Sequence, residues 1–274
     1  MKQIETYAYG GKEFMVPEID ISTGIIDFQP KLPTSVERTH PIVEAVHTTW
    51  DEEKFRTPRL PLPIDLVDDM PGFSLYRGLR ILDMPIKLEG SDWRLPAVLK
   101  PYQETLETMA GYEYAINPHL EEYNAYVTID QQPVAARSTQ RNSGLHVDGF
   151  QGARIWPKNF INRSYIAYDC IAPSFWNMGF ETSHLDPRID NYFHDFDRQA
   201  ATEQKRKVRL AAGQIVLMDA YTVHGSEPAK FDSARTFLRL SFDVLPFDRL
   251  GNTPNPLLKT GWDMVLRDAQ ASLR

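Results

Sequence analysis

The sequence predicts a mainly β protein, in which short strands form a jelly-roll or cupin-like barrel and helices pack outside it. Two observations carry this prediction. From about residue 122 onward, the chain consists of short runs rich in β-branched and aromatic residues, punctuated by Gly or Pro. One long polar segment, residues 183–206, interrupts these runs. A chain of 274 residues is long enough for one such domain with a large core.

The first part of the chain predicts little regular structure. Residues 4–16 read as a hairpin, because two strand-like runs flank a Gly-Gly pair. Residues 28–64 are rich in proline, which predicts irregular chain wrapped around a core. Residues 101–110 have the pattern of a helix, in which Pro101 suits the first turn and Gly111 supplies the stop.

The strands are expected in the second half of the chain, and residues 183–206 form either a lid or an exposed insertion between them. A helix is expected at the end, where Thr260 and Asp263 have capping-box spacing. An apolar stripe of Trp262, Val265, Leu266 and Ala269 accompanies that spacing. The predicted strands lie within residues 123–129, 144–150, 164–172, 207–213, 214–223 and 235–245.

Composition excludes some functions and favours others. The net charge is −7, which argues against a broad surface for nucleic acid. The single cysteine, Cys170, rules out an intrachain disulfide and fits a reducing compartment. The first residues carry no apolar run typical of a signal peptide, and no stretch is long and apolar enough to span a membrane. We therefore expect a cytoplasmic protein.

The segment GLHVDGFQ at residues 144–151 places an imidazole and a carboxylate two positions apart, at His146 and Asp148. Side chains at positions i and i+2 of a strand face the same side and lie roughly 6–7 Å apart along it. Both can therefore bend toward one metal ion. Two histidines and one carboxylate that leave three metal positions open are typical of non-haem Fe(II) oxygenases. A second histidine from elsewhere in the chain would complete such a site.

The bare His-x-Asp pattern is weak because it occurs twice. The second match, His184 and Asp186, lies in the polar segment and precedes Pro187, which disfavours a central strand. We therefore predict ligands at the first match only. The remaining histidines have no partner at a suggestive spacing: His40, His47, His119 and His194.

The missing histidine is expected at His224, just after the apolar run QIVLMD. Arg235 follows eleven residues later and opens a strand of alternating pattern. Two arginines on one strand face predict an anion nearby, because unpaired buried charge is costly and a guanidinium binds a carboxylate in bidentate fashion. One face of that strand carries Arg235, Phe237, Arg239 and Ser241, and the other carries Thr236, Leu238, Leu240 and Phe242.

With these four residues in this order, the sequence resembles the Fe(II)/2-oxoglutarate-dependent dioxygenase superfamily. The matching residues are His146, Asp148, His224 and Arg235. The eleven-residue step to the arginine is similar to the phytanoyl-CoA dioxygenase-like and taurine dioxygenase-like branches. In the former branch, a serine two residues past the distal histidine often contacts the cosubstrate, and Ser226 stands there. The resemblance covers residues 122–245.

The resemblance implies one dioxygenase domain with a double-stranded β-helix at residues 122–245. Residues 1–121 would then buttress this barrel and shape the substrate site, and residues 246–274 would add a C-terminal helix. It implies that Fe(II), 2-oxoglutarate and O₂ hydroxylate or desaturate an unactivated C–H bond of a small molecule, with release of succinate and CO₂. An amino acid or a natural-product intermediate is the expected kind of substrate.

The resemblance also implies roles for the residues. The metal ligands are His146, Asp148 and His224, and Arg235 with Ser226 binds the C5 carboxylate of 2-oxoglutarate. Arg239 lies where other branches place that arginine; it would otherwise bind an acidic substrate or form a structural pair. Thr128 and Tyr126 precede the metal strand, where the family often offers a hydroxyl to the cosubstrate, and a core position is the alternative for both.

Two other functions remain open. One is a non-oxidative cupin-like barrel that binds a metal or ligand, against which Arg235 argues, because such a barrel does not need an anion clamp at that step. The other is the same chemistry on a macromolecule, and the net charge of −7 argues against nucleic acid as that substrate.

Overall fold

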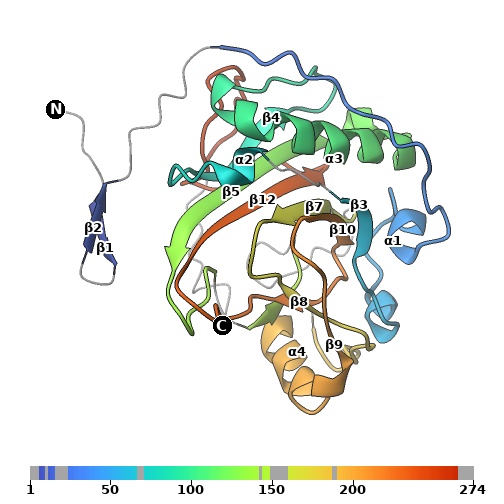
Figure 1. Ribbon diagram of the computed structural model, residues 1–274. Helices are drawn as coiled ribbons and strands as arrows, with labels where there is room; N and C mark the ends of the chain where they lie inside the picture. The colour runs from blue at the N-terminus through green and yellow to red at the C-terminus, as the bar shows by residue number, and fades with distance from the viewer. Residues whose placement is uncertain are drawn as a thin grey trace.

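The computed structural model describes residues 6–9, 12–15, 24–66, 71–141, 144–148, 160–186 and 190–264, and shows a chain made mainly of antiparallel sheets (Figure 1). The strands are β1 (Thr6–Tyr9), β2 (Lys12–Met15), β3 (Leu62–Leu66), β4 (Arg80–Lys87), β5 (Asn124–Val134), β6 (Leu145–His146), β7 (Arg163–Tyr168), β8 (Ser174–Trp176), β9 (Lys207–Arg209), β10 (Gln214–Asp219), β11 (His224–Gly225) and β12 (Ser233–Asp243). The helices are α1 (Pro41–Glu44), α2 (Pro71–Ser74), α3 (Gln103–Ile116) and α4 (Tyr192–Ala201), with 3₁₀ turns η1 (Glu52–Arg56), η2 (Ala97–Tyr102), η3 (Leu120–Glu122) and η4 (Gln204–Arg206).

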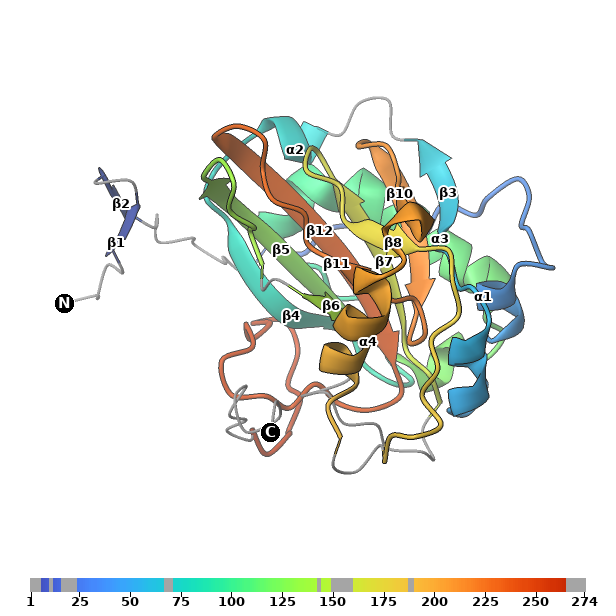
Figure 2. The same cartoon turned by 90° about the horizontal axis from the view of Figure 1, so that it is seen from below.

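The strands form two facing sheets and one hairpin. The large sheet has the order β3-β10-β7-β12-β5-β4, the small sheet has the order β6-β11-β8-β9, and every pairing is antiparallel. Figure 2 shows the small sheet and α4 on one side of the large sheet and α3 on the other. The predicted mainly β architecture is confirmed. The two sheets do not join into a closed barrel within the described residues.

Strand β12 separates two layers of core, as its alternating pattern predicts. It pairs with β5 along its whole length, from Ser233 opposite Val134 to Asp243 opposite Asn124. One face of β12 packs with α3 in the largest core cluster, through Leu238, Leu240 and Phe242. The other face points to the small sheet, where Phe237 packs with Phe175 of β8. The polar positions of that second face therefore lie between the sheets.

Helix α3 continues past the residue predicted to end it. Gly111 lies inside the helix, because the chain before it crosses the helix there: a Cβ atom at Gly111 would lie 1.8 Å from the carbonyl oxygen of Lys31. The glycine therefore permits a close backbone approach and does not act as a stop. Pro101 lies in the preceding 3₁₀ turn η2 and not in the first turn of α3. The helix is anchored at Glu113, whose buried carboxylate binds Arg163 of β7.

The polar segment 183–206 contains a packed helix. Asn191 caps α4 by accepting a hydrogen bond from the backbone N–H of Phe193 at 3.0 Å. Tyr192, Phe196 and Ala200, each four residues apart, are buried in the cluster that lies behind β6 and β11. This segment is therefore part of the support of the small sheet and not an exposed insertion. Residues 187–189 lie outside the described part.

The remaining expectations have mixed outcomes. The strands of the predicted N-terminal hairpin pair from Thr6 opposite Met15 to Tyr9 opposite Lys12. The proline-rich residues 28–64 are irregular apart from α1, η1 and the start of β3. No helix forms within the described residues 246–264, and most of the stripe predicted for a C-terminal helix lies in 265–274, outside the described part. No described helix combines the length and the apolar character that crossing a bilayer requires.

Candidate metal centre

Two histidines face each other across the first strand pair of the small sheet. His224 on β11 is the register partner of His146 on β6, and their ring centroids lie 4.4 Å apart. Two glycines allow this close pairing. Gly144 has a φ of 97°, which favours glycine. A Cβ atom at Gly225 would lie 2.9 Å from a methyl group of Leu145 and 3.3 Å from the carbonyl oxygen of Gly144.

Backbone carbonyls fix the tautomer of both imidazoles. Nδ1 of His224 lies 2.9 Å from the carbonyl oxygen of Thr222, and Nδ1 of His146 lies 3.3 Å from that of Gly144. A carbonyl oxygen only accepts hydrogen bonds, so each Nδ1 carries the proton and donates it. The lone pair on Nε2 of each ring is then free to bind a metal. Burial, and next the neighbouring His224, lower the pKa of His146 to about 3, which keeps that ring neutral at physiological pH.

Asp148 adds a carboxylate to the two histidines. One ligand atom from each of the three residues can be chosen so that all lie within 4.8 Å of one another. Burial alone would raise the pKa of Asp148, but the positive groups around it, led by Arg239, hold that pKa below its ordinary value. The site therefore presents His146 as a neutral imidazole and Asp148 as an ionised carboxylate, beside Nε2 of His224. Those are the protonation states that metal binding requires, and the donor set suits a first-row transition metal.

Arg239 holds this carboxylate from the large sheet. Its Nη1 donates to Oδ1 of Asp148 and its Nη2 donates to Oδ1 of Asp83, both at 2.9 Å. Burial opposes the charged form, yet the two carboxylates raise the pKa of Arg239 above its ordinary value. Of the roles expected for Arg239, the structure shows a pairing with carboxylates of the protein itself.

Asp83 reaches Arg239 because strand β4 is irregular. The register of β4 with β5 shifts between Ile81 and Met84, and Asp83 has a φ of 44°. Such bulges re-aim a side chain next to a functional site. The hydroxyl of Thr128 donates to Asp83 Oδ1 at 2.8 Å and accepts from the backbone N–H of Asp83 at 3.0 Å. Thr128 therefore contacts Asp83 and is not among the residues that line the cavity.

Arg235 lies further along the same strand face and is bound by neutral groups. It is 6% exposed, its Nε donates to the carbonyl oxygen of Cys170 at 3.1 Å, and its Nη1 donates to the side-chain oxygen of Gln140. Burial lowers the pKa of Arg235 to about 10, so the guanidinium is still charged at neutral pH. No carboxylate of the described chain lies within ion-pair distance of it. A buried cation in this state favours an anionic ligand.

The metal ligands and the arginines open into one cavity between the two sheets. The space between these residues, open mouth included, is about 500 Å³. Ser226 lines it together with Arg235, as the sequence predicts for a pair that binds one ligand. The apolar part of its wall consists of Ile166, Ile171, Pro173, Met218 and Phe237.

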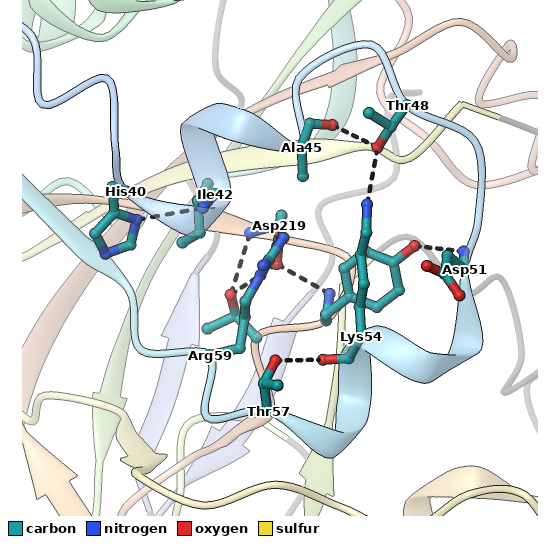
Figure 3. A network of polar contacts seen from close by, with 11 residues as sticks. His40, Ile42, Ala45, Thr48, Asp51, Lys54, Thr57, Arg59 and Asp219 are labelled. Carbon is teal, nitrogen blue, oxygen red and sulfur yellow. Dashed lines mark hydrogen bonds and ion pairs between the residues drawn. The ribbon is translucent and has the colours of Figure 1, made fainter.

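A buried network supports the turn that carries His224. Asp219, the last residue of β10, accepts hydrogen bonds from Arg59 Nε at 2.8 Å and Nη2 at 2.6 Å (Figure 3). Its other carboxylate oxygen accepts from the backbone N–H of Tyr221 and from the hydroxyl of Thr222, both at 3.0 Å. The network thus fixes the residue whose carbonyl orients the His224 ring.

Two other histidine groups suit a metal less well. His184, from the second His-x-Asp match, lies 3.3 Å from a carboxylate oxygen of Asp195 and belongs to no metal-like group among the described residues. His47, His119 and Glu122 do form such a group. However, the two rings stack at 3.8 Å with planes only 8° apart, so their in-plane lone pairs do not converge on one point.

The structure thus brings together most residues that the sequence singled out. His146, Asp148, His224, Ser226, Arg235 and Arg239 all line one cavity, and Thr128 lies behind Arg239. Tyr126 is a core residue, since its ring stacks on Phe247 at 3.9 Å. Sequence reasoning missed Asp83, Gln140 and Arg141. The first depends on a bulge with no sequence signal, whereas the other two lie only a few residues before the first metal ligand.

Comparisons with known proteins assign no family. No protein-family model matches the chain, and no curated protein matches its sequence. Similar solved structures include AviO1 from Streptomyces viridochromogenes Tue57, with 15% identity over 82% of this chain and 100% of that chain and a TM-score of 0.38. EvdO2 from Micromonospora carbonacea var. aurantiaca, complexed with 2-oxoglutarate, has 17% identity over 78% of this chain and 99% of that chain and a TM-score of 0.41. EvdMO1 has 16% identity and a TM-score of 0.27; 57% of this chain matches it, and the match spans 34% of EvdMO1. With TM-scores below 0.5, these likenesses carry no functional conclusion, which has to come from the site itself.

Proposed function

We propose that the protein is an Fe(II)- and 2-oxoglutarate-dependent oxygenase that hydroxylates or desaturates a small molecule. The observation that carries this proposal is the shared cavity of two kinds of site. One is a metal-ligand set of two imidazoles and a carboxylate, and the other is the buried guanidinium of Arg235 without an anionic partner in the described chain. A cosubstrate with a metal-chelating end and a carboxylate end would satisfy both.

Each residue has a defined part in this proposal. His146 and His224 would hold the iron through Nε2, and Asp148 through a carboxylate oxygen. Arg235 and Ser226 would bind the distal carboxylate of 2-oxoglutarate. When bound, the iron and the cosubstrate supply the oxidising chemistry, and the chain contributes orientation and exclusion of water. The apolar wall that includes Met218 and Phe237 suits the second task.

The contacts of Asp148 bear on how it would bind the metal. Its Oδ1 accepts a hydrogen bond from Arg239, which leaves Oδ2 as the oxygen without a described protein donor. Oδ2 is therefore the oxygen through which Asp148 would hold the iron. The pair of Asp83 and Arg239 would hold the carboxylate in this orientation.

A non-oxidative metal-binding protein is the alternative function. It would need the three metal ligands but not a buried cation at the far end of the same cavity. The difference can be measured, because bidentate chelation of a keto acid to Fe(II) gives a weak visible charge-transfer band. We expect this band when anaerobic protein is titrated with Fe(II) and then with 2-oxoglutarate. Iron binding without the band would favour the alternative.

Matched variants separate the roles. We expect His146→Ala to lose Fe(II) binding and His184→Ala to retain it, because only the first residue belongs to the ligand set. We expect Arg235→Gln to weaken 2-oxoglutarate binding by about 30-fold to 4,000-fold, since truncating one side of a buried charge pair costs about 2–5 kcal/mol. The exposed Arg206→Gln serves as control. Equal iron loss in both histidine variants would contradict the ligand assignment.

A further inference from the structure

Three arginines line the cavity, and their partners differ. Arg239 binds the carboxylates of Asp83 and Asp148. Arg235 binds a carbonyl and an amide oxygen. The guanidinium of Arg141 has neither a hydrogen bond nor an ion pair within the described chain, and its central carbon lies 5.5 Å from the ring centroid of Phe237. Arg141 is therefore the cavity guanidinium that the described chain leaves without any polar partner.

The charged groups that line the cavity differ in whether they are paired. The two acidic residues that line it are Asp148 and Glu227, and Glu227 is already bound by Lys207 and Arg209 at its own edge. Arg239 is paired with Asp83 and Asp148, and the distal carboxylate of 2-oxoglutarate would pair with Arg235. Asp130 acts on Arg141 electrostatically, but no carboxylate of the described chain lies within ion-pair distance of the Arg141 guanidinium.

Leaving a guanidinium in this state is costly. Burial, and next the like charge of Arg239, lower the pKa of Arg141 from its ordinary value. A buried cation has lost its hydrating water. A ligand oxyanion that hydrogen-bonds to the guanidinium replaces that water and stabilises the charge. Phe237 contacts both Arg141 and Arg235, with cation–ring distances of 5.5 and 5.4 Å, so the two guanidinium groups share one apolar neighbour.

We propose that the substrate is an organic acid whose single anionic group binds Arg141 while its apolar body lies against the wall formed by Ile166, Ile171 and Met218. This inference rests on the proposed function, because it assigns Arg235 and not Arg141 to 2-oxoglutarate. Arg141, His146 and Asp148 line the same cavity, so an anion fixed at Arg141 would place the apolar carbons of the substrate near the metal. A remote charge pair of this kind orients the bond that reacts.

The test uses full-length protein loaded with Co(II) in place of iron, so that no turnover occurs. The first step is to measure the Kd of 2-oxoglutarate by calorimetry. The second is to titrate hexanoate and its neutral counterpart hexanamide with 2-oxoglutarate at saturation. Paramagnetic broadening of the probe protons by Co(II) reports binding near the metal. The variants are Arg141→Gln, the charge-retaining Arg141→Lys, and the exposed control Arg206→Gln.

We expect hexanoate to bind at least tenfold more tightly than hexanamide to the wild-type protein. Arg141→Gln should weaken hexanoate at least tenfold and change the Kd of 2-oxoglutarate by less than threefold, while Arg141→Lys retains part of the hexanoate affinity. Equal binding of the two probes would overturn the inference. An equal loss of 2-oxoglutarate and hexanoate in Arg141→Gln would also overturn it, because Arg141 would then belong to the cosubstrate clamp.

The proposed function can fail separately. If the wild-type protein with Co(II) does not bind 2-oxoglutarate, the proposed function is refuted. The anion site is then judged by hexanoate alone. Loss of hexanoate binding in Arg141→Gln but not in Arg206→Gln supports it, and retained binding overturns it.

Discussion

Asp243, the last residue of β12, offers a sharp test of the electrostatics of the core. Its side chain is buried and accepts a hydrogen bond from the backbone N–H of Leu245 at 2.8 Å. Burial raises the pKa of Asp243 to about 7 from an ordinary value of 3.8, and the nearby Arg163 only partly opposes this. Asp243→Asn keeps an oxygen that can accept the same hydrogen bond and removes the ionisation.

The sign and size of the effect follow from that shift. The unfolded chain loses the Asp243 proton near pH 3.8 and the folded chain near pH 7, so the folded state binds more protons between those values. Stability contributed by the protonated carboxyl is therefore full below about pH 4 and is lost as the pH rises through about 7. A shift of roughly 3 pKa units corresponds to about 4 kcal/mol, at about 1.4 kcal/mol per unit.

The assay is urea unfolding of the wild-type protein and Asp243→Asn at several pH values between about 4 and 8. We expect the free energy of unfolding of the variant, relative to wild type, to rise with pH by up to about 4 kcal/mol. The control is Asp27→Asn, which makes the same substitution at a carboxyl that the fold leaves exposed. A difference between Asp243→Asn and wild type that stays constant over this range would refute the reasoning.

Three further predictions concern the supports of the site. In Asp83→Asn, Asp148 is the only carboxylate left to pair with Arg239. We therefore expect the metal affinity, measured by Co(II) titration, to fall about tenfold to 100-fold, as it does for other residues behind metal ligands. Unchanged affinity would contradict this role. Glu113→Ala leaves Arg163 buried without a carboxylate, and we expect the free energy of unfolding in urea to fall by about 3–5 kcal/mol. An exposed pair, removed by Asp92→Asn, is the control and should change stability by less than about 1 kcal/mol. Asp219→Asn should cost a similar 3–5 kcal/mol and also weaken metal binding through the His224 turn. The double variant with Arg59→Met should recover stability but not metal affinity, and recovery of both would show that the network does not position His224.

The sequence is informative where one residue type and its spacing decide the structure. The alternation of β12 is a local property of the backbone, so the faces of Arg235 and Leu238 can be read directly from the chain. The His-x-Asp spacing is local in the same sense, although only His146 lies on β6 and Asp148 follows the strand. The pairing of His146 with His224 is not local, and it could be expected only because a known ligand set requires a second histidine.

The features that sequence reasoning missed depend on contacts between distant segments. Gly111 has the appearance of a helix stop, but the backbone at Lys31 needs the space above it. Asp83 reaches Arg239 only through a register shift between β4 and β5. Strands β6 and β11 have two residues each, too few for a periodic pattern to reveal.

Those two short strands have a consequence for how long the protein resists proteolysis in the cell. They join positions 146 and 224 of the chain through only two register pairs, so little backbone pairing holds the two metal-binding strands to each other. A metal bound by both histidines would join these two strands as a cross-link does, and at 100 times its Kd it would add about 2.7 kcal/mol to the folded state. We expect chelators to expose this part of the chain to proteases first. The lifetime of the protein would then follow the supply of its metal.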